Sequence, residues 1–335
     1  MDREEIEKIL ESVSKLKVLV VGDAMLDVFI KGMPSHISSE APVPVIHFLE
    51  EKYYPGGAAN LANNVKNLVD NVDFLCCLGE DEYGETLKKR LEEQGIKLIP
   101  FFCREAKTIK KIRIVAPVQQ ICRVDEESDS LKYQIPFQEF TKLFIPEKYD
   151  LIIISDYAKG LINQKIYNHI RKTAKGKIIA VDPKPKNKIF YKGADLIKPN
   201  FSEALAITKA DIGNDLIEAF NNEQLAPATI ALIEFTIPCI KLLQQIKNVV
   251  MTAGMNGMFI SKGKEGVIHI PAIKRFVYNS CGAGDTAMAV LSTVFAAGFG
   301  LEKAAQLANY AASIAVASPI TFSIQKEFLF HFAKS

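Results

Sequence analysis

The stretch KVLVVGD, residues 17–23, is a short run of mainly β-branched residues that ends in a glycine and an aspartate. Runs of the same kind follow at 73–79, 150–156, 177–183, 195–200 and 248–254. Helix-like segments lie between them, at 58–69, 82–94, 161–175 and 201–208. Apolar strands that alternate with helices are typical of a parallel sheet covered on both faces. The sequence therefore predicts an α/β fold with a mostly parallel central sheet.

Polar residues stand where these strands end, and ligands of such sheets bind beyond the carboxyl ends of the strands. In the segment GDAMLD, residues 22–27, Asp23 and Asp27 come just after the first strand. A carboxylate can accept hydrogen bonds from two neighbouring hydroxyls and so hold a polyol. Asp23 is equally explained as a turn residue. We therefore treat the residues at the strand ends as candidate site residues.

The totals exclude several classes of protein. The chain has 335 residues, 24% of them charged, and a net charge of +2, which provides no field for steering nucleic acid. No apolar run reaches the roughly 18 residues that span a bilayer, and the acidic, amphipathic start is unlike a signal peptide. The six cysteines are scattered, so we expect reduced thiols, and the five histidines lack metal-ligand spacing. We expect a single cytoplasmic domain, residues 1–335, with no nucleic-acid or membrane partner.

Two stretches interrupt the alternation of strands and helices. Residues 28–49 contain three prolines and alternate apolar with polar side chains, and residues 108–124 alternate in the same way. Alternation indicates strands with one buried face, so we predict a small β lid outside the main sheet. A two-stranded ribbon is marginal by itself in water, and its apolar face needs a cover. Residues 211–247 are helical in composition but weakly patterned, and the sequence does not place them.

The glycine turn GAGD, residues 282–285, opens a small, apolar run of helical length that ends at Gly298. Free N–H groups and the helix dipole at such an N-terminus attract negative charge. An aspartate among those donors should stay ionised and accept a proton. The combination suits phosphoryl transfer, in which donors hold the moving group while a carboxylate deprotonates a hydroxyl. A turn of this kind is also common as a purely structural element.

Two further motifs fit the same chemistry. PGGAAN, residues 55–60, is a second glycine turn that opens a helix, and Asn60 could hydrogen-bond a sugar hydroxyl or cap the turn. NFSE, residues 200–203, sets Asn200 and Glu203 one helical turn apart on one face. The pair could orient magnesium-bound waters, because Mg²⁺ keeps much of its hydration shell. Equally, Asn200 could be an N-cap and Glu203 its capping-box partner.

Together these motifs resemble the PfkB-type, ribokinase-like carbohydrate kinases. They occur in the order of that family: VVGDAMLD, PGGAAN, SDYAKG, DPK, PNFSE, TAGMNG and CGAGDT. Within the family, ISSEAPVPV (37–45) and QQICRVDEE (119–127) are similar to segments of the heptose-7-phosphate kinases of lipopolysaccharide core synthesis. The resemblance implies a ribokinase-like fold and the use of ATP and Mg²⁺. It also implies transfer of a phosphoryl group to the anomeric hydroxyl of D-glycero-D-manno-heptose 7-phosphate.

The same resemblance implies roles for individual residues. Asp285 would be the general base, and the anion hole would be formed by Gly282, Ala283 and Gly284. The sugar phosphate would be held by Asp27, Gly56, Gly57, Asn60, Lys110, Arg113, Arg123, Asp156 and Lys159. The nucleotide would lie against Lys198, Asn200, Thr252, Gly254, Gly257 and Asn309, and magnesium would be positioned by Asn200 and Glu203. In the resembling kinases the lids of two subunits pack on each other, so we expect a homodimer through the β lid.

The chain departs from the family pattern at three places. Asn279 stands where an aspartate is usual, three residues before GAGD, and the lost charge predicts weaker handling of metal. His36 replaces a lid arginine, which leaves recognition of the sugar's own phosphate open. The segment VASPITFSIQ, residues 316–325, lacks the usual glycine–threonine. Many relatives also carry a nucleotidyltransferase domain; because the sequence has no H-x-G-H motif, we expect no such domain and no adenylyl transfer.

Two alternatives to a heptose-phosphate kinase remain open at this point. The first is a PfkB-type kinase for another sugar or sugar phosphate, which His36 allows. The second is a degenerate kinase fold that binds sugar phosphate or nucleotide as a regulator, which Asn279 suggests. Retention of Asp285, Asn200 and Glu203 together argues against the regulator, because a protein without catalysis has no need of a base.

Overall fold

A computed structural model describes residues 1–117, 119–187, 191–210, 227–263, 266–318 and 321–334 of the chain. The weakly patterned segment 211–247 lies partly outside these residues, since 211–226 are not described. Its remaining part contains helix α8 (Pro227–Gln244). Within the described residues, no helix combines the length and the apolar character needed to cross a membrane.

The larger sheet is mostly parallel, as the sequence predicts. Its strands lie in the order β13-β12-β11-β10-β9-β8-β1-β4-β5. Neighbours from β11 to β5 pair in parallel, whereas β12 and β13 add antiparallel strands at one edge. The strands are β1 (Lys17–Gly22), β4 (Asn71–Gly79), β5 (Lys97–Cys103), β8 (Leu151–Ser155), β9 (Ile178–Asp182), β10 (Leu196–Ile197), β11 (Asn248–Thr252), β12 (Met258–Lys262) and β13 (Gly266–Ile270).

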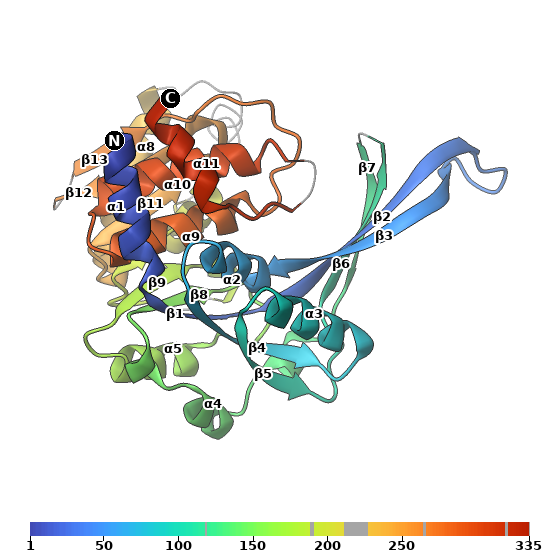
Figure 1. The fold of residues 1–335 in the computed structure, drawn as a ribbon, viewed down its shortest axis with the longest axis horizontal. Helices are drawn as coiled ribbons and strands as arrows, with labels where there is room; N and C mark the ends of the chain where they lie inside the picture. The colour runs from blue at the N-terminus through green and yellow to red at the C-terminus, as the bar shows by residue number, and fades with distance from the viewer. Residues whose placement is uncertain (118, 188–190, 211–226, 264–265, 319–320, 335) are drawn as a thin grey trace.

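Helices cover both faces of this sheet. Strand β1 shows why: Val18 and Val20 enter one buried core cluster, and Leu19 and Val21 enter another on the opposite face. The first cluster is completed by α1 (Arg3–Ser14), α2 (Ala58–Lys66), α3 (Glu82–Glu93), α9 (Ala283–Ala296), α10 (Leu301–Ala315) and α11 (Lys326–Leu329). The second is completed by α4 (Phe137–Leu143), α5 (Gln164–Thr173), α6 (Phe201–Thr208) and α8. In Figure 1, α1, α2, α9 and α10 lie above the strands β1, β8 and β4, and α4 and α5 lie below them.

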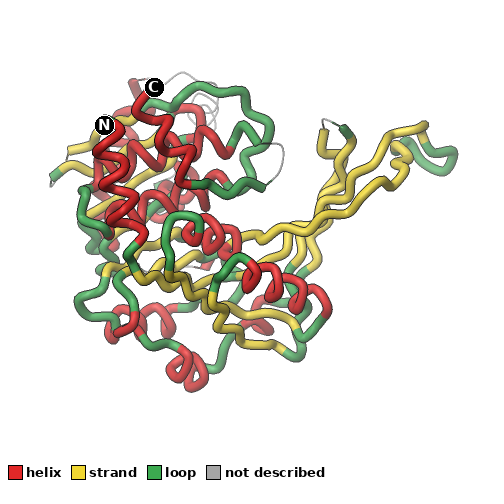
Figure 2. Tube along the Cα trace, viewed as in Figure 1, coloured by secondary structure: helices red, strands yellow, loops and turns green. Residues whose placement is uncertain are grey.

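The predicted lid is a four-stranded sheet in the order β3-β2-β6-β7. Its strands are β2 (Ala24–Ile37), β3 (Pro44–Gly57), β6 (Lys110–Ala116) and β7 (Gln119–Glu126). Both stretches predicted as lid are extended strands, but β2 begins earlier and β3 ends later than the alternation indicated. The lid projects from the helix-covered body as a long ribbon (Figures 1 and 2). Apolar side chains are exposed along it, including Phe48 at 64% and Leu49 at 61% of their accessible surface.

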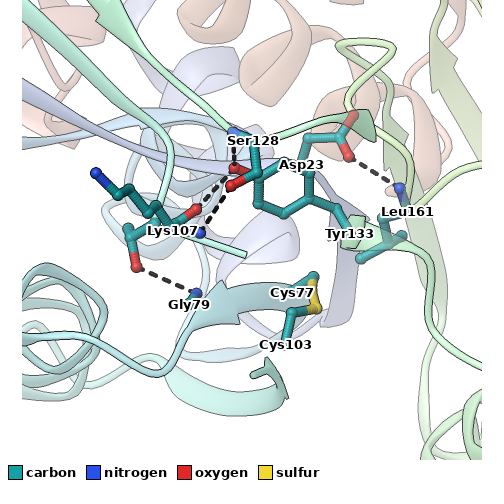
Figure 3. The surroundings of a disulfide bond; sticks show 9 residues. Asp23, Cys77, Gly79, Cys103, Lys107, Ser128, Tyr133 and Leu161 are labelled. Carbon is teal, nitrogen blue, oxygen red and sulfur yellow. Dashed lines mark hydrogen bonds between the residues drawn. A yellow bond between two sulfur atoms is a disulfide. The ribbon is translucent and has the colours of Figure 1, made fainter. Parts of the chain in front are cut away.

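The cysteines differ from expectation at one place. Cys77 in β4 and Cys103 at the end of β5 form a disulfide (Figure 3). The prediction of reduced thiols is therefore wrong for this pair. The two are 26 residues apart in sequence, and the parallel pairing of β4 with β5 alone brings them together. Among the described residues, the remaining cysteines, Cys76, Cys122, Cys239 and Cys281, are free.

The disulfide lies beside the segment that leads from β5 into the lid. Figure 3 shows the Tyr133 hydroxyl between two backbone groups of this region. It donates to the Lys107 carbonyl at 2.7 Å and accepts from the Ser128 N–H at 2.8 Å. Gly79, two residues after Cys77, donates to the Thr108 hydroxyl at 3.1 Å. The base of the lid is therefore tied to the carboxyl edge of the large sheet.

Candidate active site

A pocket of about 140 Å³ lies where the base of the lid meets the large sheet and the start of α9. It draws on segments far apart in the sequence, as expected for a site beyond the carboxyl ends of parallel strands. Its lining residues are Asp27, Gly57, Asn60, Lys111, Arg113, Tyr157, Cys281, Gly282, Asp285 and Thr321. The structure thus brings together the glycine turn, the PGGAAN turn and the lid, which the sequence proposed as parts of one site.

The glycine turn begins α9, as predicted. Gly282 is the N-cap residue and has a φ of 81°, in the left-handed region that favours glycine. A Cβ atom at Gly282 would also lie 2.8 Å from the Asn60 Nδ2 atom. Glycine is therefore required here by both the backbone conformation and the packing of α2 against the turn. The Ala283 N–H donates to the Ser280 carbonyl at 3.3 Å, whereas the next N–H groups of the first helical turn lack an acceptor within the helix and can meet an anion.

Asp285 is buried and held by two side chains. The Asn60 Nδ2 donates to Oδ2 at 2.8 Å, and the Tyr157 hydroxyl donates to Oδ1 at 2.6 Å. The two donors come from α2 and from the loop that follows β8. Asn60, predicted to hold the sugar, therefore also orients the candidate base. Tyr157 belongs to the SDYAKG motif but is not among the predicted site residues, because the sequence alone does not indicate which way its ring points.

Burial dominates the electrostatics of Asp285. Loss of solvent raises the pKa of this carboxyl above its usual value, while the hydrogen bonds from Tyr157 and Asn60 and the charge of Lys198 act in the opposite direction. The sequence argument considered only the nearby donors, which favour the ionised form. The net upward direction of the pKa suits a general base, whose pKa works best near the operating pH.

Asp27 forms a buried ion pair with a lid residue. The Arg113 Nη1 lies 2.7 Å from the Asp27 Oδ1, and both side chains are almost fully buried. Thr321 donates to the Asp27 Oδ2 at 3.3 Å, so the segment lacking the family's glycine–threonine still supplies a threonine to the pocket. A Cβ atom at Gly56 would lie 2.8 Å from the Asp27 Cγ atom. Gly56 is therefore placed to leave room for this carboxylate.

Neighbouring lysines of β6 lie in different surroundings. Lys110 Nζ lies 2.8 Å from the Glu126 Oε2 and 3.5 Å from the centre of the Tyr83 ring, and it does not line the pocket. Lys111 does line the pocket, with Nζ 5.7 Å from the centre of the Tyr157 ring. Within the part of the chain that the structure describes, no carboxylate forms an ion pair with Lys111. The prediction chose Lys110, but strand alternation puts Lys111 and Arg113 at the pocket.

Three other predicted sugar contacts lie outside the pocket lining. Arg123, on β7, is half-exposed and pairs with Asp125 at 2.8 Å. Lys159 pairs with Glu127. Asp156 is buried and accepts hydrogen bonds from the Ala158 N–H at 2.7 Å and from the Tyr191 hydroxyl. Their predicted contacts with substrate stay predictions.

Lys198 lies between the GAGD turn and the carboxylate of Asp182, a residue that the sequence analysis did not propose as part of the site. Its Nζ lies 3.1 Å from the Asp182 Oδ2, and a Cβ atom at Gly284 would lie 3.9 Å from the same Nζ. Burial raises the pKa of Asp182 to about 7, against the lowering effect of Lys198, and the charges of Glu203 and Asp285 raise it further. Asp182 is the aspartate of the DPK motif and stands at the end of a predicted strand. That position was the one feature of the sequence that could have indicated Asp182 as a site residue.

Asn200 and Glu203 form a capping box at the start of α6, which was one of the two interpretations of the NFSE motif, the other being a magnesium site. The Asn200 Oδ1 accepts from the Glu203 N–H at 2.8 Å, and the Glu203 Oε2 accepts from the Asn200 N–H at 3.0 Å. Lys184 lies 2.9 Å from the other Glu203 oxygen. The described residues contain no group of three or more His, Cys, Asp or Glu arranged to hold a metal ion. The magnesium role of this pair stays a prediction.

The remaining nucleotide candidates lie near the ends of β11 and β13. Thr252 forms a parallel β-bridge with Asn200. Gly254 and Gly257 both have positive φ, and a Cβ atom at Gly257 would lie 2.2 Å from the Ile270 carbonyl oxygen. Asn309 in α10 donates to the Pro271 carbonyl at 2.8 Å. The predicted nucleotide-binding residues therefore lie on segments that contact one another. Their binding of a nucleotide stays a prediction.

The two unusual residues have local partners. The Asn279 Oδ1 accepts from the Cys281 N–H at 2.9 Å, so its side chain supports the turn before GAGD. His36 is exposed near the outer end of β2, where its Nδ1 lies 2.9 Å from the Ser35 hydroxyl, and it does not line the pocket. Neither observation tests the predicted effects on metal or on sugar specificity.

Comparison with known proteins agrees with this fold. Residues 15–325 match the family described as "pfkB family carbohydrate kinase". The chain therefore belongs to the pfkB family of carbohydrate kinases. It is 35% identical over 322 residues to the Bifunctional protein HldE of Trichlorobacter lovleyi, covering 95% of this chain and 62% of that protein. It is also 35% identical over 322 residues to the Bifunctional protein HldE of Shewanella sediminis, covering 95% of this chain and 63% of that protein. The chain thus spans less than two thirds of these relatives' length.

Solved structures share the fold at lower identity. Phosphofructokinase-2 from Escherichia coli, in complex with potassium, superimposes with a TM-score of 0.73 at 15% identity, covering 96% of this chain and 100% of that one. Arabidopsis thaliana ribokinase, complexed with ribose and ATP, gives a TM-score of 0.70 at 18% identity, covering 96% and 99%. The ribokinase-like fold predicted from the sequence is confirmed.

Proposed function

We propose that the chain transfers a phosphoryl group from ATP to the anomeric C1 hydroxyl of D-glycero-D-manno-heptose 7-phosphate, giving the 1,7-bisphosphate. This product would serve ADP-heptose and lipopolysaccharide core synthesis. The observation that carries the kinase proposal is the position of Asp285: a buried carboxylate at the N-terminus of α9, facing a pocket lined by the cations Lys111 and Arg113. The choice of heptose follows from the resemblance of the lid segments to those of the heptose-7-phosphate kinases, and the similarity to HldE proteins supports it.

The proposed chemistry is an in-line displacement. Asp285 takes the proton of the sugar hydroxyl as the oxygen bonds to the γ-phosphorus and the bond from that phosphorus to the ADP oxygen breaks. The N–H groups at the start of α9 would balance the charge on the moving group together with Lys198, whose Nζ lies 3.9 Å from a Cβ atom built at Gly284. Asp27 and Asn60 would hold the sugar hydroxyls in the pocket.

The residues near Lys198 fit a magnesium ion bound with the nucleotide. The negative charge of Glu203 contributes to the raised pKa of Asp182, and carboxylate oxygens are donors that Mg²⁺ prefers. Asp182, Glu203 and Asn200 would hold the ion, directly or through water. When bound, magnesium would neutralise charge on the phosphates and orient them. At position 279 the resemblance implies an aspartate, so the amide of Asn279 carries one negative charge less than the usual family pattern.

A panel of acceptors tests the proposal. We expect ATP turnover in a coupled assay with the heptose 7-phosphate, and much lower kcat/KM with fructose 1-phosphate, ribose and nucleosides. Preference for another sugar would retain the kinase and overturn the heptose assignment. Absence of turnover with every acceptor, together with tight binding of a sugar phosphate or nucleotide, would favour the regulator instead.

We also propose that two lids pack together in a homodimer. The described part of the lid exposes Met33, Ile37, Val43, Phe48, Leu49 and Val124. A monomer rarely leaves so many large apolar side chains uncovered on one projecting sheet, and a two-fold axis would bury the same surface twice. The pairing would also steady the strands that carry Asp27 and Arg113.

Phe48→Glu is expected to split this dimer, because a charge would have to be buried at the apolar contact. The KM for the sugar should then rise more than the KM for ATP. Light scattering at micromolar concentration measures the mass, and Leu131→Glu is the matched control, since Leu131 is 71% exposed and lies outside the lid strands. A monomeric mass for the unmodified protein would contradict the proposal.

A further inference from the structure

The carboxylate of Asp285 is fixed from two sides. Asn60 donates to one oxygen and Tyr157 to the other, at 2.8 Å and 2.6 Å. Asn60 is further held by α2, where the Asn64 Nδ2 donates to its backbone carbonyl at 2.9 Å. Two short hydrogen bonds to different oxygens allow one orientation of the carboxylate plane. The tyrosine hydroxyl is a group that the sequence analysis did not assign.

The loop that carries Tyr157 is built around a buried carboxylate. Asp23, which directly follows β1, accepts hydrogen bonds from backbone N–H groups of this loop. The Tyr157 and Lys159 N–H groups donate to Oδ2 at 2.9 Å and 3.2 Å, and the Leu161 N–H donates to Oδ1 at 3.2 Å. Both carboxylate oxygens of Asp23 therefore accept hydrogen bonds from the protein backbone, which agrees with its interpretation as a turn residue rather than a sugar ligand.

The same loop contains one strained residue and one position that only glycine can fill. Ala158 has a φ of 57°, a left-handed conformation that residues with a Cβ atom seldom adopt. Gly160 has a φ of 126°, and a Cβ atom there would lie 2.0 Å from the Ser130 carbonyl oxygen. Conformations of this kind persist only where surrounding contacts determine them. Their position beside Tyr157 indicates that the loop is shaped to aim this side chain at α9.

Tyr157 is suited to be a lasting donor. Burial, and next the negative charge of Asp285, raise the pKa of its hydroxyl well above the usual value. The hydroxyl therefore keeps its proton throughout the pH range in which a carboxylate base operates. A hydroxyl that keeps its proton stabilises the ionised carboxylate more than the protonated one.

We propose that Tyr157 is a positioning residue for the base, whose hydroxyl holds Asp285 in a single orientation and in its proton-accepting form. The inference rests on the proposed function, since it concerns the same reaction. Tyr157 itself transfers no proton; the proton of the sugar hydroxyl goes to Asp285. Among the described residues, other charged or titratable groups around Asp285 include Lys198, Asp27, Asp182, Cys281, Lys111 and Arg113. All of them remain when the tyrosine hydroxyl alone is removed.

Tyr157→Phe removes the hydroxyl and leaves the ring. The Asp285 carboxylate loses a hydrogen-bond donor, so its pKa should rise further. As the pH is lowered, the variant should therefore lose activity at a higher pH than the unmodified protein does. We expect the acidic limb of kcat/KM to move up by about one pH unit, with a smaller change on the plateau. The control is Tyr149→Phe, which removes a hydroxyl that donates to Asp73 at 2.7 Å. That pair lies at the amino ends of β8 and β4, away from the pocket.

A second measurement does not depend on turnover. The carboxyl ¹³C signal of Asp285, assigned by its loss in Asp285→Asn, should titrate at higher pH in Tyr157→Phe and be unchanged in Tyr149→Phe. An unchanged Asp285 titration in Tyr157→Phe would overturn the inference even if the protein is a kinase. Conversely, a shifted titration in a protein that phosphorylates no acceptor would overturn the proposed function and leave the role of Tyr157 in place.

Discussion

Asp285→Asn is expected to lower kcat by roughly 10²–10⁴-fold while leaving nucleotide affinity almost unchanged. The amide has nearly the shape of the carboxylate and keeps an oxygen for either Asn60 or Tyr157, but it cannot accept the sugar's proton. The loss should therefore fall on kcat in a steady-state assay, and thermal unfolding should show a folded protein. The transition-state donors of α9 and Lys198 remain, which is why some activity should persist.

The matched control for this variant is Asp73→Asn. Asp73 also accepts a hydrogen bond from a tyrosine, at 2.7 Å from the Tyr149 hydroxyl, but it lies at the opposite end of the sheet from the pocket. Its substitution should alter stability without a comparable loss of kcat. Near-normal turnover by Asp285→Asn would show that another group takes the proton, and the proposed base would have to be abandoned.

Lys111→Met should raise the KM for a phosphorylated sugar by about 10- to 100-fold, the size expected for loss of one hydrogen bond between charged groups. Lys111 lines the pocket and forms no ion pair among the described residues, whereas its neighbour Arg113 is committed to Asp27. An anionic group on the sugar would therefore meet Lys111. The KM for ATP and the kcat should change much less, because methionine keeps the length of the side chain.

Lys110→Met provides the comparison for this prediction. It changes the adjacent residue of the same strand, but Lys110 is paired with Glu126 and stands over Tyr83 instead of lining the pocket. We expect a modest loss of stability and an unchanged KM for the sugar. Equal KM values for Lys111→Met and the unmodified protein would place the sugar's anionic group elsewhere, and Arg113 and Arg123 of the lid would then be the next candidates.

The fold could be predicted in most respects because its signals are local. β1, β4, β8, β9 and β11 each correspond to an apolar run that ends in a polar residue. The lid was predicted too short for a physical reason: the first residues of β2 are buried on both sides, so residues 24–29 show no alternation. The antiparallel edge strands β12 and β13 were not predicted, because a short apolar run in the sequence does not indicate which strand it will pair with.

The site was predicted less completely, since it depends on where distant segments meet. The GAGD turn and Asn60 could be found because glycine patterns mark them. Lys110 was preferred to Lys111 because nothing in the sequence says which face of β6 meets the pocket. Tyr157 and Asp182 became candidates only once the loops around the strand ends were placed. The Cys77–Cys103 bond likewise depends on the pairing of β4 with β5.

Strand β2 passes without interruption from the pocket to the outer end of the lid. Its 14 residues span roughly 45 Å at the rise of an extended chain, with Asp27 near the inner end and Ile37 at the outer end. Pairing with β3 is regular around Asp27 and shifts register only beyond Lys31. The strand thus connects the outer end of the lid directly to Asp27, the carboxylate that we propose to hold the sugar. A second subunit or an engineered protein bound at the outer end of β2 is therefore expected to alter the proposed sugar contact of Asp27 without touching the sugar.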